Sequence, residues 1–485
     1  MNQKFFSNFT WRLAERWFSQ FVTLLITMVL ARLLDPTVNG TVAIVSVFIS
    51  LFAIFVDSGF GGALIQKKDA DDLDYSSVFY FNIVVCVLLY VVLFFAAPLI
   101  AKLYDIPILT PLIRVQSIAL IVSGVTSIQA AYISKHMLFK KQFFITLIAT
   151  GVSGPVGIYA AYLGYGPWAM VIQSVVNSVL SMCCLWFAIS WRPKLMFSFT
   201  RLKSLFSFGS KLLVSSLLYT GYADLRQLII GKFYSPADLA YYNKAYTVPS
   251  MINSGISTSI GSVLFPAMVD VQDDTAKIKA MIKRTILLHS YVMAPMFVGL
   301  AVCAEPVIAL LFSEKWLPSV PFLRIFCFIY VLEGLGMANT NALKAIGKSD
   351  LTLRIEFIKT PMYIVLLLAS IPFGVMAVAY SFVVGVTIAQ IICAGYSKKL
   401  FGYSLWDQLR DILPNLLLCV MMGACVWCVS LLDLNHIVTL LIQVPCGVAV
   451  YLLGSVIFKN ETFRYVLNLA QPVLNKLIGK VKHKS

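Results

Sequence analysis

The sequence predicts an all-α integral membrane protein with about fourteen transmembrane helices. Of the 485 residues, 59% are hydrophobic and only 12% are charged, whereas soluble proteins are about 45–50% apolar and about 25% charged. So few charges cannot cover the surface of a water-soluble globule of this size, and disorder would require low hydrophobicity. The apolar residues also form runs of about 20 residues, the length that crosses a bilayer as a helix.

Each apolar run of spanning length is expected to form one helix. The predicted spans cover 13–34, 41–65, 76–101, 112–134, 142–163, 166–190, 205–231, 241–266, 285–312, 320–343, 352–372, 374–396, 411–432 and 436–458. The connections between them are short, and none is long enough for a folded domain outside the membrane. In the tail, apolar residues recur near helical spacing between lysines, which is typical of a helix lying on the membrane surface.

The basic residues predict the orientation, because Lys and Arg gather on the cytoplasmic side of membrane proteins. With a cytoplasmic N-terminus, the cytoplasmic segments hold 29 of the 38 Lys and Arg residues. Several outer connections, such as 164–166 and 433–436, carry none. We therefore expect both termini in the cytoplasm. The net charge of +16 then reflects topology, and a nucleic-acid partner is not expected.

The chain also resembles itself at an offset of 200–210 residues. The matches are ARLLDPTVNG (31–40) with GKFYSPADLA (231–240), APLIA (97–101) with EPVIA (305–309), Arg114 with Arg324, Gly124 with Gly334, and YGPWAM (165–170) with FGVMAV (373–378). Six spans per unit give both halves one orientation, as in transporters with parallel repeats. This predicts an N-terminal six-helix lobe (1–200), a C-terminal six-helix lobe (201–400), two additional helices (401–458) and a cytoplasmic amphipathic tail (459–485).

Several strings carry a resemblance to a known family. They are ARLLDPTVNGTVAIV, DSGFGGALIQKKD, GYGPWAMVIQ, YYNKAYTVP, VLFPAMVDVQDD, LFSEKWLPSVPFLRI and GKSDLTLRIEFIK. Together they resemble the Wzx-type polysaccharide and lipopolysaccharide flippases of the multidrug/oligosaccharidyl-lipid/polysaccharide (MOP) flippase superfamily. The resemblance runs in order from about residue 7 to 400.

The resemblance implies a multi-pass protein of the bacterial inner membrane, with membrane lipids around it. It would carry an undecaprenyl-diphosphate-linked oligosaccharide to the periplasmic leaflet by alternating access between two lobes. The glycan would serve lipopolysaccharide, capsule or exopolysaccharide biosynthesis, with a functional link to glycosyltransferases and a glycan polymerase. Two alternatives remain open: a drug or small-molecule exporter of the same superfamily, and a membrane enzyme such as a polymerase or ligase. The short outer connections disfavour an enzyme.

A diphosphate requires a polar, cationic path through the membrane, so charged residues inside spans are the candidate site residues. Arg12, Glu15 and Arg16 share one face of the first helix. They form either an ordinary basic cap or a diphosphate-facing group, and the resemblance places the first helix at the substrate portal. Lys359 lies about 10 Å into its span at 1.5 Å per residue, and Glu356 three residues earlier either neutralises it or shares a gating role.

Three further residues complete the candidate set. Asp57 lies beside several glycines and marks either a coupling-ion site or a glycine-rich helix end. Asp224 and Arg226 lie near the outer end of the seventh span, as a mutual pair, interface anchors or an outer gate. Arg226 is the best-placed base for the outer half of the cavity. No phosphate loop of the pattern G-x-x-x-x-G-K-[ST] occurs, so ATP is not expected as the direct energy source, and neither a cofactor nor a metal is predicted.

Overall fold

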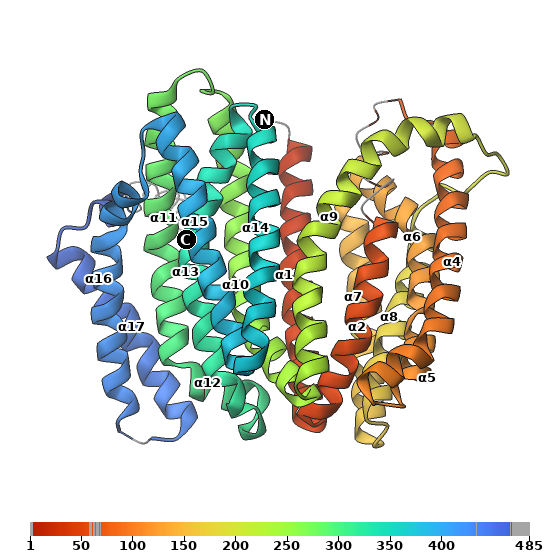
Figure 1. The fold of residues 1–485 in the computed structure, drawn as a ribbon, viewed down its shortest axis with the longest axis horizontal. Coiled ribbons are helices and arrows are strands. Elements are labelled where there is room, and N and C mark those ends of the chain that lie inside the picture. The colour runs from red at the N-terminus through yellow and green to blue at the C-terminus, as the bar shows by residue number, and fades with distance from the viewer. Residues whose placement is uncertain are drawn as a thin grey trace, which may run out of the picture. The chain divides into compact units, whose positions relative to one another are not determined.

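The computed structural model describes residues 3–57, 61, 64, 67, 69–432, 434–465 and 467. All the regular structure in this part of the chain is helical, which confirms the predicted fold class (Figure 1). The chain divides into two compact units, Met1–Ala240 (unit 1) and Tyr241–Ser485 (unit 2). The predicted lobe boundary lies at residue 200 instead, and the division into two six-helix lobes stays a prediction.

Unit 1 holds the helices drawn from red to yellow-green in Figure 1. They are α1 (Gln3–Leu33), α2 (Pro36–Asp57), α4 (Asp72–Tyr104), α5 (Leu109–Gln116), α6 (Ile118–Lys135), α7 (Phe139–Tyr162), α8 (Pro167–Ala188) and α9 (Phe199–Phe233). α7 packs against both α1 and α8, and α6 packs against α4 and α8. α9 packs on α2 and α4, so the seventh predicted span lies in the first compact unit.

Unit 2 holds the helices drawn from green to blue in Figure 1, and α10 enters it from the end of unit 1. They are α10 (Pro236–Val269), α11 (Thr275–Val302), α12 (Ala304–Phe312), η1 (Glu314–Ser319), α13 (Val320–Ala345), α14 (Ser349–Ser370), η2 (Ile371–Phe373), α15 (Val375–Phe401), α16 (Leu405–Ser430) and α17 (His436–Ile457). α11 packs against α13 and α16, and α15 packs against α13 and α14. The last two helices, α16 and α17, pack on each other.

Twelve helical segments of the described chain are long and apolar enough to cross a membrane. The protein is therefore a multi-pass membrane protein. α9 and α10 have 35 and 34 residues, also enough to cross, but part of each lies outside the described side chains. The predicted count of fourteen spans depends on these two helices.

The arginines matched by the internal repeat make the same kind of contact in each half. Arg114 Nε donates to the Phe94 carbonyl at 3.2 Å, and Arg324 Nε donates to the Ala301 carbonyl at 3.3 Å. In both cases the acceptor lies on the preceding long helix. The equivalence agrees with a repeated construction of the two halves.

The matched glycines also have the same role. A Cβ added at Gly124 of α6 would lie 2.6 Å from Cys86 Sγ of α4, and one added at Gly334 of α13 would lie 2.0 Å from His289 Nδ1 of α11. Real Cβ atoms do not approach other atoms so closely, so each glycine allows two helices to pack without a side chain between them. The buried His289 is thus a packed residue of unit 2.

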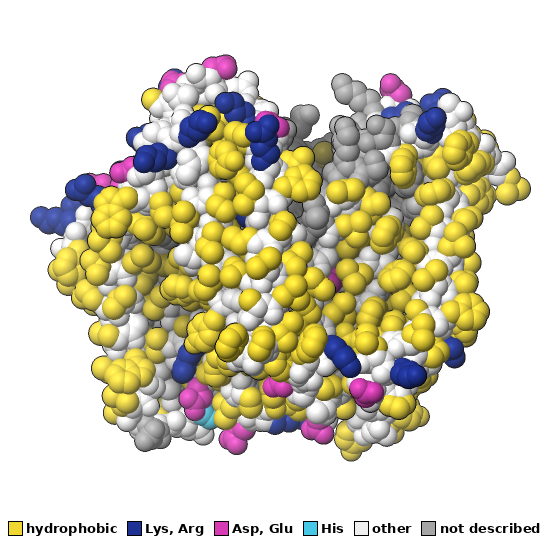
Figure 2. All heavy atoms as spheres, in the orientation of Figure 1, with side chains coloured by type: hydrophobic (Ala, Val, Ile, Leu, Met, Phe, Trp, Pro, Cys, Tyr) yellow, Lys and Arg dark blue, Asp and Glu magenta, His cyan; other side chains and the backbone are white. Residues whose placement is uncertain are grey.

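The surface has the pattern expected of helices in lipid (Figure 2). Hydrophobic side chains cover the sides of the helices, and charged side chains gather toward the helix ends. In each unit we name one end the basic end: in unit 1 the end where α4 and α9 begin, and in unit 2 the end where α11 and α16 begin. These ends carry most of the bases that the sequence assigns to the cytoplasm.

Candidate functional site

α9 and α10 carry three buried charged groups. Charged side chains inside a membrane must face protein or water, because hydrocarbon cannot solvate them. Asp224 and Arg226 of α9 are 6% and 5% exposed, and Lys244 of α10 is 9% exposed. These buried charged side chains make α9 and α10 candidate positions for contacts with a polar ligand or water.

On α9, Asp224 and Arg226 have separate partners. Asp224 accepts hydrogen bonds from Ser50 Oγ of α2 at 2.5 Å and from Gln227 Nε2 at 3.4 Å. The Arg226 guanidinium lies 5.5 Å from the centre of the Tyr222 ring. The predicted possibility of a mutual pair is not realised. Asp224 instead ties α9 to α2, while Arg226 supplies a buried positive charge in unit 1.

On α10, Lys244 is buried among aromatic rings. Its Nζ lies 5.5 Å from the centre of the Phe312 ring and 5.3 Å from that of Trp316. No carboxylate or hydrogen-bond acceptor among the described residues meets its ammonium. Cation–π contacts with two rings compensate only part of the cost of burial. The sequence signal for this residue was present in the string YYNKAYTVP, a lysine inside a predicted span, and it was not selected as a site residue.

Farther along α10, a short polar chain reaches α13. Ser257 Oγ donates to Asn253 Oδ1 at 2.9 Å, and Asn253 Nδ2 donates to Glu333 Oε2 at 3.1 Å. The serine and asparagine lie in the eighth predicted span (241–266). Glu333 was missed, although it lies in the middle of the predicted span 320–343, where a charged residue is itself a signal of a site.

On α14, the predicted pair between Glu356 and Lys359 is formed. Lys359 Nζ lies 3.1 Å from Glu356 Oε1, with side-chain exposures of 14% and 43%. The ammonium is thus the more buried partner, and the carboxylate remains largely open. The contact itself agrees with both readings of the pair.

The candidates near the first two helices are only partly described. Glu15 of α1 accepts a hydrogen bond from Thr146 Oγ1 of α7 at 3.3 Å, and Arg16 is exposed. The side chains of Arg12 and Asp57 lie outside the described residues. Asp57 is the last described residue of α2, and its predicted role stays a prediction.

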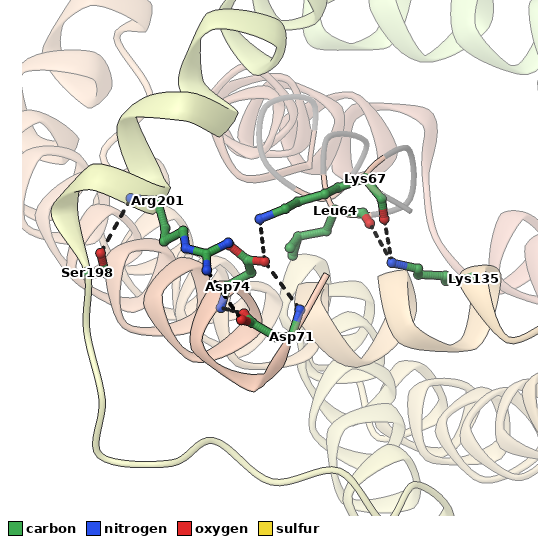
Figure 3. Close-up of polar contacts among 7 residues, drawn as sticks. All are labelled: Leu64, Lys67, Asp71, Asp74, Lys135, Ser198 and Arg201. Atoms are coloured by element: carbon green, nitrogen blue, oxygen red, sulfur yellow. Dashed lines mark hydrogen bonds and ion pairs between the residues drawn. The ribbon is translucent and has the colours of Figure 1, made fainter. Parts of the chain in front are cut away.

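A charged cluster at the basic end of unit 1 was not predicted (Figure 3). Asp74 of α4 has a fully buried side chain, with Lys67 Nζ at 2.5 Å and Arg201 Nη1 of α9 at 3.8 Å. Lys135 of α6 donates to the carbonyls of Leu64 at 3.3 Å and Lys67 at 2.6 Å. We name Lys67, Asp74, Lys135 and Arg201 the α4 charge cluster. It joins the segment after α2 to α4, α6 and α9.

The helix cap beside this cluster fixes its geometry. Asp71 and Asp74 form a capping box, in which Asp71 accepts the Asp74 backbone N–H at 2.9 Å and its own N–H bonds to Asp74 Oδ2 at 3.2 Å. The backbone hydrogen bond from Asp74, assisted by Arg201, lowers the pKa of the Asp71 carboxyl. The negative charges thus lie at the helix N-terminus, where the dipole favours them.

Unit 2 contains an apolar groove of about 440 Å³. It is lined by residues of α10, α11, α12, α16 and α17, among them Met296, Leu300, Met422, Val444 and Leu452. Gln443 is the one amide in the lining, and its Nε2 donates to the Val426 carbonyl at 3.2 Å. Such a surface suits a hydrocarbon chain far better than a polar group.

Solved structures show where this fold has been seen before. The chain is similar to the lipid II flippase MurJ in an inward closed conformation, with a TM-score of 0.76 and 17% identity over 93% of this chain and 99% of that one. It is also similar to an inward-facing multidrug resistance MATE family transporter of the MOP superfamily, with a TM-score of 0.60 and 16% identity over 83% and 98% of the two chains. These likenesses establish a shared fold.

Comparison of the sequence with known proteins finds relatives that act in polysaccharide biosynthesis. The chain is 27% identical to the teichuronic acid biosynthesis protein TuaB of Bacillus subtilis over 412 residues, which cover 82% of this chain and 84% of the relative. It is 26% identical to the lipopolysaccharide biosynthesis protein WzxC of Escherichia coli over 411 residues, covering 81% and 82%. The family described as polysaccharide biosynthesis protein matches residues 29–321. Since this match covers more than half of the sequence, the chain belongs to the polysaccharide biosynthesis protein family.

Proposed function

We propose that this protein flips an undecaprenyl-diphosphate-linked oligosaccharide across the bacterial inner membrane for synthesis of a surface polysaccharide. The observation that carries the proposal is the presence of buried bases in the membrane helices of a polysaccharide biosynthesis family member. Arg226 is 5% exposed and Lys244 is 9% exposed, and the Lys359 side chain is 14% exposed. A diphosphate is a strong acceptor for such groups.

The apolar groove of unit 2 supports a lipid-linked substrate. A polyprenyl chain has no polar atoms along most of its length, and the groove lining is almost entirely apolar. Headgroup and chain would thus be accommodated by chemically different surfaces. The transporters and flippases among the relatives favour transport over catalysis, so we assign no enzymatic reaction.

The mechanism we propose is alternating access between two lobes (1–200 and 201–400), extended by the helices of 401–458 and the tail 459–485. The matched roles of Arg114 and Arg324, and of Gly124 and Gly334, support a repeated construction. Arg12, Arg16, Arg226 and Lys359 are the proposed cationic contacts of the diphosphate. Glu15, Asp57, Asp224 and Glu356 are the proposed coupling or gating acids. Both termini would lie in the cytoplasm, beside the glycosyltransferases that make the substrate.

The test is a gene deletion combined with a sidedness assay. Without the protein, lipid-linked repeat units should accumulate in the inner leaflet, where a membrane-impermeant glycan-modifying reagent does not reach them in spheroplasts. Re-expression should restore both reagent access and surface glycan. Normal glycan in a deletion strain with no second flippase would contradict the proposal.

A further inference from the structure

A second cavity, of about 850 Å³, lies at the basic end of unit 2. Its walls come from the start of α11, the first half of α16 and the residues that follow α17. The bases in its lining are Lys283, Arg410 and Lys459. Figure 2 shows Lys and Arg gathered at this end of unit 2, above a belt of hydrophobic side chains.

Two of these bases have no anion of their own. Lys283 Nζ lies 2.8 Å from Asp411 Oδ1, and Asp411 also accepts the Tyr403 hydroxyl at 2.7 Å, so this pair is satisfied. Arg410 and Lys459 are exposed, and no described carboxylate pairs with either. The remaining acid of the lining is Glu461, also exposed and without a described partner. The lining therefore carries three bases against two acids, a net charge of +1, and Asp407 lies one turn before Arg410 on α16.

The wall that follows α17 is held in place by buried hydrogen bonds. Asn460 Nδ2 donates to Asn415 Oδ1 of α16 at 2.8 Å, and Asn415 Nδ2 donates to Ser290 Oγ of α11 at 2.9 Å. The Asn460 side chain also accepts the backbone N–H of Thr462 at 2.9 Å. These hydrogen bonds connect the three segments that form the walls, so the shape of the cavity is fixed by the fold.

Lys459 occupies a backbone conformation that favours glycine. Its φ is 51°, directly after the C-cap of α17 at Phe458. Helices commonly place glycine at this left-handed position, because a side chain is strained there. Lys459 lines the cavity, although glycine would be less strained at this position.

Below the bases, the cavity continues into an apolar surface. Leu413, Leu417 and Val420 of α16 are 51%, 56% and 66% exposed, and all three line the cavity. Leu417 lies seven residues, about 10 Å along the helix, beyond Arg410. Exposed leucines in a membrane helix face acyl chains, and Lys and Arg at helix ends reach the polar headgroup region.

We propose that this cavity binds an anionic phospholipid of the bilayer, with Arg410 and Lys459 on the headgroup phosphate and the acyl chains along Leu413, Leu417 and Val420. The order of charge and hydrocarbon along α16 matches that of a phospholipid lying parallel to the membrane normal. Basic cavities between membrane helices are suited to such headgroups. The inference is independent of the transported substrate, because the cavity lies entirely among α11, α16 and the segment after α17.

The test uses the full-length protein in a neutral detergent, with phosphatidylglycerol as the titrated probe and the unfolding midpoint as the readout. Phosphatidylglycerol should raise the midpoint in a saturable way, and phosphatidylcholine should not. Each base close to an anionic lipid contributes about fivefold in binding. The double variant Arg410→Gln with Lys459→Gln should therefore weaken the apparent affinity by about 25-fold.

Charge-matched variants separate this site from general electrostatics. Lys398→Gln with Lys399→Gln removes two exposed bases from the same end of unit 2 and should leave the affinity unchanged. Glu461→Gln removes the remaining acid and should strengthen binding. The proposal would be overturned if the Lys398 and Lys399 double variant lost as much affinity as the Arg410 and Lys459 double variant. Equal stabilisation by phosphatidylcholine and phosphatidylglycerol would also overturn it. Saturable stabilisation by inorganic diphosphate that the Arg410 and Lys459 changes abolish would likewise assign the site to a free anion.

Discussion

Replacing Lys359 with glutamine should reduce glycan export while leaving the protein inserted. A lysine at this depth costs about 2.5–3.5 kcal/mol to bury in a membrane, and a helical pair at this spacing returns about 0.2–0.5 kcal/mol. The observed partner, Glu356, is 43% exposed, so solvent screens the pair and its contribution falls at the low end. Roughly 2–3 kcal/mol must therefore come from water or from a bound anion.

The size of the functional loss follows from the hydrogen bond that the lysine would make. A hydrogen bond to a charged group contributes about 1.5–3 kcal/mol, and each 1.36 kcal/mol is a factor of ten. Lys359→Gln should then lower export by about 10- to 150-fold. Lys359→Arg keeps the charge and should retain more activity than the glutamine variant. Export is measured as surface glycan per cell, normalised to the amount of protein in the membrane.

The double variant decides between the two roles of the lysine. If Lys359 only balances Glu356, then Glu356→Gln combined with Lys359→Gln should restore what the single change removed. If the lysine contacts the diphosphate, the double variant should be as impaired as Lys359→Gln alone. Export equal to wild type in the double variant would refute the substrate contact and leave the lysine as a structural partner.

Three further outcomes are expected. Asp74→Asn leaves Lys67 and Arg201 without their shared carboxylate and should destabilise the protein by an amount at the low end of about 3–5 kcal/mol, seen as a lower unfolding midpoint. Gly334→Ala should cost about 1–3 kcal/mol by overpacking, since its Cβ would lie 2.0 Å from a ring nitrogen. In an otherwise cysteine-free protein, Tyr165→Cys should react with an impermeant thiol reagent from outside intact cells, and Lys203→Cys should not.

Each of these outcomes has a control. Gly395→Ala lies in the same unit as Gly334 but meets nothing within 4 Å, so its midpoint should not fall. An Asp74→Asn protein with an unchanged midpoint would show that the α4 charge cluster contributes no stability. Labelling of the residue-203 cysteine from outside, with protection of residue 165, would reverse the proposed orientation.

The spacing of residues along the sequence predicts contacts between side chains of the same helix. Glu356 and Lys359 are three residues apart, and such residues are neighbours on a helix surface; the structure forms the pair. Asp224 and Arg226 are two residues apart, and residues at that spacing do not face each other. Their separate partners follow from this geometry, so the same rule could have excluded the pair from the sequence.

The missed residues depend on contacts between distant segments. Asp74 reads as an ordinary helix-start acid, and only the docking of α9 and of the segment before α4 buries it. Lys244 lies close to the start of α10, where a lysine would often reach solvent along the helix. It is buried because Phe312 and Trp316, from a later part of the chain, cover it. The contacts that bury Asp74 and Lys244 join distant parts of the chain, so they leave no periodic pattern in the sequence.

The buried polar contacts of α9 and α10 have a consequence for how the chain enters the membrane during synthesis. A polar side chain opposes the partitioning of its helix alone into lipid, so the helix is favoured by polar partners that are already there. For α9 the Ser50 partner of Asp224 is made 174 residues earlier and is available when the helix emerges. For α10 the Glu333 partner of Asn253 is made 80 residues later, which at 5–20 residues per second is a wait of about 4–16 s. During that interval α10 would remain beside the insertion machinery or its chaperones, and quality control would act on this helix first.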